Sequence, residues 1–382
     1  MRVLLFGTYD TATHPRVATI AEGLAASGLD VAQCNAPLGL DTAARVDMLA
    51  RPWTAPLLLL RLARRWTTLA AAARRMPRPD VVVVGYLGHF DVHLARLVFR
   101  RVPIVLDHLV GASDTGRDRR LDGGPRQALL RLIDAAALAA ASVIVVDTDE
   151  HLAALPARHH GRAVVVPVGA PSAWADAAPA DPDPARPVPD PARPGPLRVV
   201  FYGLYTPLQG TPVIGAALGE LTGEPVEVTM IGTGQDEAQA KAAAAANPAV
   251  RWLDWVPATE LPAVVAGHDV CLGIFGTGEK ALRVVPNKVF QGAAAGCAIV
   301  TSDTAPQRRA FGDAAVLVPP GDAKALAEAL AGFAADRAAL AQARDRARSV
   351  ASAVFAPESV VGPLMYLPGS GPRGRRGARA TR

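Results

Sequence analysis

Cationic side chains cluster in "FGTGEKALRVVPNKVFQGAAAGCAIVTSD", residues 275–303. Lys280 and Arg283 lie in a loop after an apolar run, and this loop leads into an expected helix. Asn287 is a good N-cap for that helix, whose first N–H groups are free to bind an anion. Lys288, in the first turn, is unfavourable against the helix dipole unless an anion lies beside it. The pattern therefore favours an anion-binding site over a solvated basic loop.

Glycines mark the ends of three further apolar runs. They are Gly7, Gly203 in "LRVVFYG", and the pair Gly232 and Gly234 in "IGTGQD". Parallel α/β sheets bind ligands beyond the carboxyl ends of their strands, so we assign these glycines to a ligand site. An ordinary turn explains the "IGTGQD" pair equally well. Neither the G-x-G-x-x-G nor the G-x-x-x-x-G-K-[ST] motif occurs at these turns, so a dinucleotide cofactor or an ATP P-loop is not indicated.

Histidines follow apolar runs in the first half of the chain. His108 lies just beyond a run in "VLDHLVG", where a histidine is as often structural as functional. His89 and His93 are four residues apart, a spacing that places both on one face of a helix. A third metal ligand is not evident beside them, so we expect no metal there, and surface or substrate-facing roles instead.

Two sets of short apolar runs must position these side chains. They occupy residues 2–6, 81–85, 103–107, 142–147 and 163–168, then 197–203, 226–232, 269–275, 297–303 and 314–320. Helical patterns separate them, at 15–28, 125–141, 211–223 and 236–247. Continuous apolar strands that alternate with helices predict parallel sheets covered on both faces. The predicted fold class is α/β, with two Rossmann-like, doubly wound domains facing a cleft.

A proline-rich segment separates the two sets. Residues 171–196 contain nine prolines in 26 residues, so we expect a linker there. The first domain is then 1–170 and the second 197–367, with a terminal helix expected to return to the first domain. The tail 368–382 is rich in glycine, proline and arginine, and we expect it to be disordered.

Composition narrows the functional classes. The 382 residues are 50% hydrophobic and 20% charged, as in globular proteins. The net charge of +5 arises from the five arginines of the tail, so a nucleic-acid partner is not expected. Three cysteines far apart in the chain indicate a reducing compartment rather than disulfides or a zinc site. Because the first apolar run is too short for a signal peptide and no run could span a bilayer, we expect a cytoplasmic protein.

The second half contains a set of motifs that is more specific than any single turn. "FYG…PLQG", "MIGTG", "VVPNKVFQGAAAGCAIVTSD" and "AAVLVPPGDAKALAEAL" occur in that order. The chain resembles, from its first strand to about residue 360, the retaining nucleotide-sugar glycosyltransferases of the GT-B fold, family four. This resemblance implies sugar transfer from a nucleotide-diphosphate sugar to a glycan, lipid-linked or small-molecule acceptor. It also implies retention of configuration and a reaction without metal or cofactor.

The chain departs from this family at charged positions. Gln291 and Arg283 stand where the family usually has glutamates, and Gln291 can still hydrogen-bond a donor hydroxyl. Leu204 and Gln209 stand in the turn where the family usually has an Arg and a Lys that bind diphosphate. We expect Arg283 and Lys288 to replace that missing positive charge, because a leaving diphosphate needs fixed cations. We assign donor binding to Gly7, Gly203, Gly232, Gly234, Glu279, Lys280, Arg283, Asn287, Lys288 and Gln291.

The first domain is expected to supply the remaining groups. A histidine near the donor sugar is usual in this family, and His108 is our choice of catalytic residue. His14 and His89 are assigned to the acceptor side. Asp147 and Asp149 match the D-x-D motif of metal-dependent glycosyltransferases, but those have a single nucleotide-binding domain. We expect Asp149 to cap a short helix instead.

Alternatives remain for a basic segment and for the activity. Residues 51–79 contain seven arginines and no acid, so a helix over 55–75 suits peripheral contact with the inner membrane surface and a lipid-linked acceptor. A helix packed on the first sheet with a solvated arginine face is the competing interpretation. The other possible functions are a non-catalytic sugar-nucleotide-binding relative and a sugar-nucleotide epimerase. The epimerase should place paired acids or bases around the sugar, and none is evident.

Overall fold

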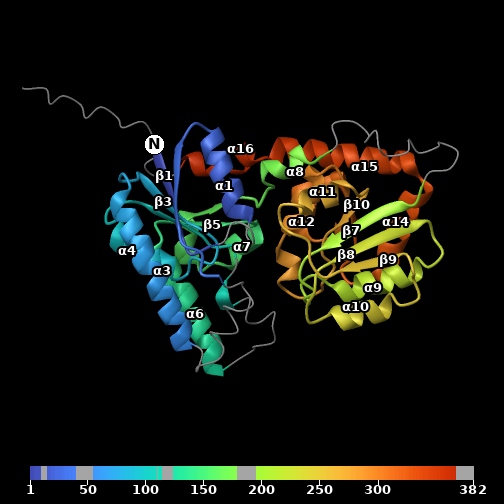
Figure 1. The fold of residues 1–382 in the computed structure, drawn as a ribbon, viewed down its shortest axis with the longest axis horizontal. Helices are drawn as coiled ribbons and strands as arrows, with labels where there is room; N and C mark the ends of the chain where they lie inside the picture. Colours follow the sequence, from blue (N-terminus) through green and yellow to red (C-terminus); the bar gives the residue numbers. More distant parts are fainter. Residues whose placement is uncertain (10–14, 40–54, 110, 114–123, 179–194, 367–382) are drawn as a thin grey trace, which may run out of the picture.

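Two parallel sheets organise the computed structural model, which describes residues 1–9, 15–39, 55–109, 111–113, 124–178 and 195–366. The first sheet has the strand order β2–β1–β3–β4–β5–β6 and the second β12–β11–β10–β7–β8–β9. Every strand pairing is parallel, and helices cover both faces of each sheet (Figure 1). The predicted fold class, two doubly wound α/β domains, is confirmed.

The first domain contains six strands. They are β1 (Arg2–Gly7), β2 (Asp30–Asn35), β3 (Val81–Val84), β4 (Ile104–Asp107), β5 (Val143–Val146) and β6 (Ala163–Val165). Apolar side chains from α1 (Pro15–Ala26) pack on one face. The other face is covered by α3 (Ala55–Arg75), α4 (Asp91–Val98) and α6 (Gly124–Ala140). The short helix α7 (Asp149–Ala154) follows β5.

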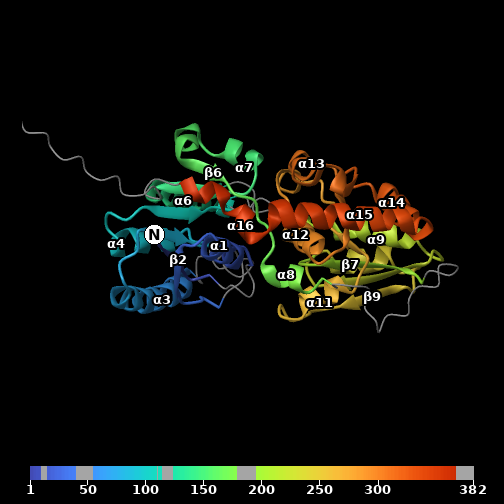
Figure 2. The same ribbon diagram turned by 90° about the horizontal axis from the view of Figure 1, so that it is seen from above.

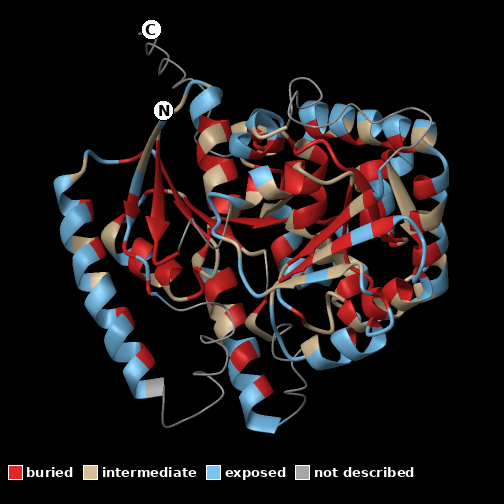
Figure 3. Ribbon diagram, turned by 45° about the vertical axis from the view of Figure 1, so that its right-hand side comes forward, coloured by how far each residue is buried: buried red, intermediate tan, exposed pale blue. Residues whose placement is uncertain are grey.

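The second domain repeats this plan. Its strands are β7 (Leu197–Tyr202), β8 (Val226–Ile231), β9 (Val250–Leu253), β10 (Val270–Leu272), β11 (Ala298–Ser302) and β12 (Ala315–Val318). One face is covered by α9 (Thr211–Glu220), α10 (Glu237–Ala243) and α14 (Ala323–Ala335), and the other by α8 (Ser172–Asp176), α11 (Leu261–Ala266), α12 (Asn287–Ala294) and α13 (Ala305–Phe311). Helix α15 (Arg337–Val350) contributes to both clusters. The central strands of both sheets are buried, whereas the outer faces of the helices are exposed (Figure 3).

Sequence patterns predicted every strand except β2 and β9. Both are edge strands, and their residues are mostly exposed or half-buried. Because a half-buried edge strand does not need a continuous apolar run, "DVAQCN" and "VRWL" lack the signal that reveals a central strand.

The end of the described chain connects the two domains. After α15, helix α16 (Pro357–Val360) lies against α1 of the first domain (Figure 2). The approach is close, because a Cβ added at Gly23 would lie 2.0 Å from the carbonyl oxygen of Pro357. Within the expected linker, α8 places Trp174 in a stack with Tyr202 of β7, at 5.7 Å between ring centres. No helix of the described residues is long and apolar enough to cross a membrane.

Candidate active site between the two domains

Lys288 lies buried at the carboxyl end of β7. It is 4% exposed, and its Nζ lies 3.7 Å from the centre of the Phe201 ring. Nζ also donates a 2.5 Å hydrogen bond to Gln209 Oε1. Burial lowers the pKa of this ammonium to about 7, against a smaller opposing effect of the Cys271 thiol. No carboxylate pairs with Lys288 in the part of the chain that the structure describes, so an anion bound beside it would stabilise its charge.

Glycines bring the surrounding loops close to this ammonium. A Cβ added at Gly203 would lie 3.1 Å from Lys288 Nζ, so the glycine leaves room for the ammonium. At Gly210, which precedes α9 with a φ of 66°, a Cβ would lie 2.5 Å from the carbonyl carbon of Phe275. The N–H of Phe275 donates to the carbonyl oxygen of Gln209 at 3.0 Å. The backbone of Gln209 is thus fixed while its side chain accepts from Lys288.

The two glycines of "IGTGQD" serve a packing role. A Cβ added at Gly232 would lie 1.9 Å from the carbonyl oxygen of Gly203. At Gly234, a Cβ would lie 2.4 Å from the carbonyl oxygen of Tyr205. These contacts bring the loop after β8 against the loop after β7. Both glycines therefore allow the loop after β8 to pack on the loop after β7, and the loop after β7 is the one that adjoins Lys288.

Gly7 makes room for an aromatic ring. A Cβ added there would lie 3.1 Å from Tyr9 Cδ1, and one added at Gly85 would lie 2.7 Å from the same atom. The Tyr9 side chain is 1% exposed and so fills the space that the two glycines leave at the ends of β1 and β3. Packing around this ring accounts for both glycines.

The loop before α12 is one of the places where the domains touch. Arg283, at the end of a 3₁₀ turn (Ala281–Arg283), forms an ion pair with Glu279, whose side chain is 72% exposed. Its carbonyl oxygen accepts a 2.9 Å hydrogen bond from Thr148 Oγ1 of the first domain. Lys280 is half-buried and immediately precedes this turn. The charge of Arg283 is therefore already compensated, unlike that of Lys288.

Two polar residues of α12 differ from their predicted roles. The prediction that Asn287 caps the helix is wrong, because Pro286 is the N-cap residue, with a ψ of 150°, and Asn287 is the first helical residue. Proline has no N–H to leave unpaired at this boundary and its restricted φ suits the position. Gln291 is 4% exposed, and its Oε1 accepts a 2.9 Å hydrogen bond from Tyr202 Oη. Its amide carbonyl is therefore occupied within the domain.

The first domain contributes two histidines to its own carboxyl edge. His108 follows β4 and His89 follows β3, with ring centres 5.3 Å apart. Burial and then His89 lower the pKa of His108 to about 3, so this imidazole is neutral at physiological pH. Asp134 of α6, which the sequence patterns did not reveal, lies 3.1 Å from His89 Nε2. His14 lies outside the described residues.

The edge that contains His108 faces the second domain. The N–H of His108 donates to the carbonyl oxygen of Val145 at 2.8 Å, and Leu109 packs against the apolar cluster of the second domain that includes Tyr202. Thr148, three residues beyond Val145, makes the contact to Arg283. His108 and Lys288 therefore belong to facing edges of the two sheets.

The acids of the D-x-D motif have protein partners. Asp147 pairs with His151, and Asp149 pairs with Arg309 of the second domain at 3.0 Å. The prediction that Asp149 caps α7 is wrong: the Oγ1 of Thr148 accepts from the N–H of His151, and Asp149 is the first helical residue. The extended backbone of Thr148 suits the cap position.

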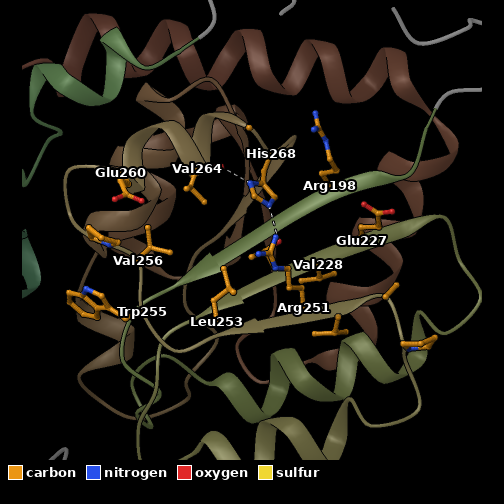
Figure 4. A pocket seen from close by; sticks show the side chains of 16 residues that line it. Arg198, Glu227, Val228, Arg251, Leu253, Trp255, Val256, Glu260, Val264 and His268 are labelled. Carbon is orange, nitrogen blue, oxygen red and sulfur yellow. Dashed lines mark hydrogen bonds between the residues drawn. The ribbon is translucent and has the colours of Figure 1, made fainter. Parts of the chain in front are cut away.

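A separate groove of roughly 670 Å³ lies on the second sheet, between α11 and the edge strand β9 (Figure 4). Arg198, Glu227 and Arg251 lie along it, and His268 bonds both Val264 and Thr229 at its wall. None of the residues assigned to donor binding lines this groove. It is therefore distinct from the edge that faces the first domain.

Comparisons with known proteins define the class. Residues 196–336 match the model of the family Glycosyl transferases group 1. No match to a curated protein was found. Sucrose-phosphate synthase from Thermosynechococcus elongatus is similar in structure, with a TM-score of 0.68, 14% identity, and coverage of 94% of this chain and 96% of that one.

Two further solved structures cover the same extent. Anabaena HepE in complex with UDP-glucose has a TM-score of 0.61 and 14% identity, over 94% of this chain and 97% of that chain. An Escherichia coli structure described as trehalose-6-phosphate bound with UDP-2-fluoro glucose has a TM-score of 0.63 and 13% identity, over the same shares, 94% and 97%. The fold is thus GT-B, residues 196–336 are a glycosyl transferases group 1 domain, and the chain is a glycosyltransferase. The resemblance to GT-B glycosyltransferases drawn from the sequence motifs is confirmed, and retention of configuration stays a prediction.

Proposed function

We propose that this protein transfers a sugar from a nucleotide-diphosphate sugar to a hydroxyl acceptor, with retention of configuration and without a metal on the diphosphate. The observation that carries the proposal is the buried ammonium of Lys288, which lacks an acidic partner among the described residues. It contacts Gln209, in the turn where the family usually has its diphosphate-binding Lys. Lys288 thus supplies from α12 the charge that this turn has lost, and a leaving diphosphate is the anion it would stabilise.

The other donor contacts are proposed around this charge. The diphosphate would lie beside Gly203 and the start of α12, whose first N–H groups face the same edge. Arg283 would exchange its exposed partner Glu279 for the donor, because that ion pair is partly solvated and therefore weak. Support for a nucleotide-sugar donor comes from the similar structures that hold UDP-glucose or UDP-2-fluoro glucose.

His108 is the first-domain residue that we place at the donor sugar. Its neighbour Leu109 packs against the second domain, so the imidazole lies where the two edges face one another. A neutral imidazole can donate or accept one hydrogen bond with a sugar hydroxyl. His89 and His14 are proposed for the acceptor side. The acceptor is a glycan, a lipid-linked sugar or a small molecule; a similar structure from Burkholderia xenovorans is described with glucose-6-phosphate.

A panel of nucleotide sugars tests the proposal. Thermal shift identifies the donor that binds, and release of free nucleoside diphosphate then measures turnover with varied acceptors. We expect His108→Ala to reduce turnover by about tenfold, through a lost hydrogen bond to the sugar, with donor affinity unchanged. His93→Ala, which changes a histidine of α4 four residues beyond His89, is the matched control. Binding without turnover across all acceptors would instead show a non-catalytic sugar-nucleotide-binding protein.

We also propose a peripheral contact with anionic membrane surfaces through α3. Leu58, Leu62 and Leu69 pack into the first domain, whereas Leu57, Leu59 and Leu60 are 48%, 56% and 65% exposed. Exposed arginines accompany these leucines, and α3 contains no acid. This combination suits an anionic lipid surface. Cosedimentation with phosphatidylglycerol vesicles should be lost in Leu59→Ser/Leu60→Ser and kept in Leu97→Ser, an equally exposed leucine of α4. Equal cosedimentation of both variants, or none by the wild type, would refute the contact.

A further inference from the structure

Three side chains of the first domain converge behind its carboxyl edge. One ligand atom from each of His89, His108 and Asp134 lies within 4.8 Å of the other two. His89 and Asp134 are 7% and 8% exposed. His108 Nδ1 is buried without a hydrogen-bond partner among the described residues, whereas His89 Nε2 lies 3.1 Å from Asp134 Oδ1 and pairs with it. Buried polar atoms are normally satisfied, so the unsatisfied nitrogen of His108 beside this pair indicates an absent partner.

The backbone holds the two histidines in these positions. Leu87, which precedes His89 by two residues, has a φ of 59°, a left-handed conformation that is unusual for leucine. A Cβ added at Gly88 would lie 2.3 Å from Val84 Cγ1, so the turn admits only glycine there. On the neighbouring strand, the N–H of His108 is bonded to β5. Each ring is thus positioned by a constrained turn or by a strand pairing rather than by a flexible loop.

Asp134 is oriented by the segment that follows His108. Its Oδ1 accepts a 2.8 Å hydrogen bond from the N–H of Ala112, and its Oδ2 accepts a 3.0 Å bond from that of Ser113. Gln127, on the same helix, donates to the carbonyl oxygen of Ser113 at 3.0 Å. Two N–H bonds leave lone pairs on each carboxylate oxygen. The carboxylate is therefore ionised, fixed in place, and still able to bind a cation.

We propose that His89, His108 and Asp134 form a binding site for a divalent transition metal ion of the zinc class. Two imidazole nitrogens and one carboxylate oxygen are a ligand set that zinc, and also cobalt or nickel, accepts with further positions left open. The metal would satisfy His108 Nδ1 and would bind His89 Nε2 and the Asp134 carboxylate at the same time. The competing arrangement, a hydrogen bond from His89 to Asp134, leaves His108 Nδ1 without a partner.

The site is separate from the proposed position of the donor diphosphate. It includes His108, the residue that we place at the donor sugar. A metal on Nδ1 fixes the His108 ring and leaves Nε2 as the nitrogen available to a substrate hydroxyl. In a metal-bound histidine, one ring nitrogen binds the metal and the other usually forms a hydrogen bond. The proposal rests on the geometry of the first domain and not on the glycosyltransferase activity.

Metal binding to the full chain is the direct test. Protein stripped with a chelator and dialysed is titrated with Co²⁺, and d–d absorption and zinc competition report stoichiometry and affinity. We expect one ion per chain. We expect its affinity to fall by about 10- to 100-fold or more in His89→Ala, His108→Ala and Asp134→Asn, since each removes a ligand or the charge. His93→Ala and His160→Ala are matched controls that should bind as the wild type does.

Two outcomes would overturn the proposal. One is the absence of stoichiometric binding in the wild type. The other is unchanged binding in His89→Ala and His108→Ala, which would place the ion elsewhere, for example at His151 and Asp147, another close His–carboxylate pair among the described residues of this domain. Circular dichroism of the metal-free variants checks that they fold. X-ray absorption of the zinc-loaded wild type should then show two imidazole ligands, and a spectrum without imidazole would also refute the site.

Discussion

The carboxyl edges of the two sheets have the same strand–turn–helix plan but different electrostatic character. In the second domain the edge contains a buried ammonium, Lys288, without an acidic partner among the described residues. In the first domain it contains neutral imidazole at His108, with Asp134 as the nearby charge. One edge is therefore complementary to an anion and the other to hydroxyl groups or a cation. The two halves of a nucleotide-sugar donor, diphosphate and sugar, differ in the same way.

Removal of the ammonium should have the largest effect on this contrast. We expect Lys288→Met to weaken UDP binding by about 100-fold, the loss of a charge-assisted interaction of roughly 2–3 kcal/mol. The free protein should be no less stable, because a buried charge is replaced by an apolar chain of similar length. Calorimetric titration at pH 6.5 measures both the affinity and, with a thermal scan, the stability. Lys241→Met, an exposed lysine of α10 paired with Glu237, is the control. Equal affinity in the two variants would refute the contrast.

The second largest expected effect is a change in UDP affinity with pH. Burial holds the pKa of Lys288 at about 7 in the free protein, and a bound diphosphate raises it. UDP affinity should therefore fall by about tenfold per pH unit above pH 7, with uptake of a proton on binding. Titrations between pH 7 and 8.5 in buffers of different ionisation enthalpy test this. A flat profile would show that Lys288 does not contact the diphosphate.

The lowered pKa of Lys288 also affects the stability of the free protein. Between pH 7 and 10.5 the unfolded chain keeps the lysine proton that the folded chain has lost, so the free energy of unfolding should rise with pH in this window. Denaturant unfolding of the free protein at pH 7 and pH 9 measures it. Lys288→Met lacks this contribution, so the difference between the two proteins isolates it.

A tyrosine pair sharpens the role of Gln291. Among the described residues, Gln291 Oε1 accepts one hydrogen bond, from Tyr202 Oη, and Tyr202→Phe removes it. An unpaired buried acceptor costs about 1–3 kcal/mol. We expect the melting temperature to fall by roughly 2–10 °C while UDP affinity stays unchanged. Tyr205→Phe is a matched control, because its hydroxyl has no partner among the described residues. A loss of UDP affinity without a loss of stability would instead assign Gln291 to the donor.

The ion pairs that join the two edges should have the smallest effect on turnover. Arg309 joins Glu150 at 2.6 Å and Asp149 at 3.0 Å across the domains, but its side chain is 48% exposed. Exposed ion pairs contribute about 1 kcal/mol or less, so Arg309→Ala should change turnover by no more than about fivefold. Arg308→Ala removes a comparable pair with Asp303 inside one domain and is the control. A larger and specific loss in Arg309→Ala would show that the two edges depend on this ion pair to face each other.

Local sequence signals predicted the fold well and the site in part. Central strands are continuous apolar runs and were predicted. The edge strands β2 and β9 were not predicted, because they are partly solvated and lack such a run. The conflict of Lys288 with its helix dipole led to the proposed anion site, but the contact of Lys288 with Gln209 joins residues 79 positions apart. Such long-range contacts have no local signal, and the same holds for Asp134 with His89. The pairing of Arg283 with Glu279, in contrast, has the helical i,i+4 spacing and was within reach of the sequence.

The return of α16 to the first domain has a consequence for the order of folding. Val360, Val361 and Leu364 are buried in the same apolar cluster as Leu5 and Ile20. The domain that the ribosome makes first therefore completes its core only after the second domain has been synthesised. Until then one face of its sheet is partly uncovered, and the segment that contains Val360, Val361 and Leu364 covers it last. Vectorial synthesis thus delays completion of the first domain until residues 357–364 have been made.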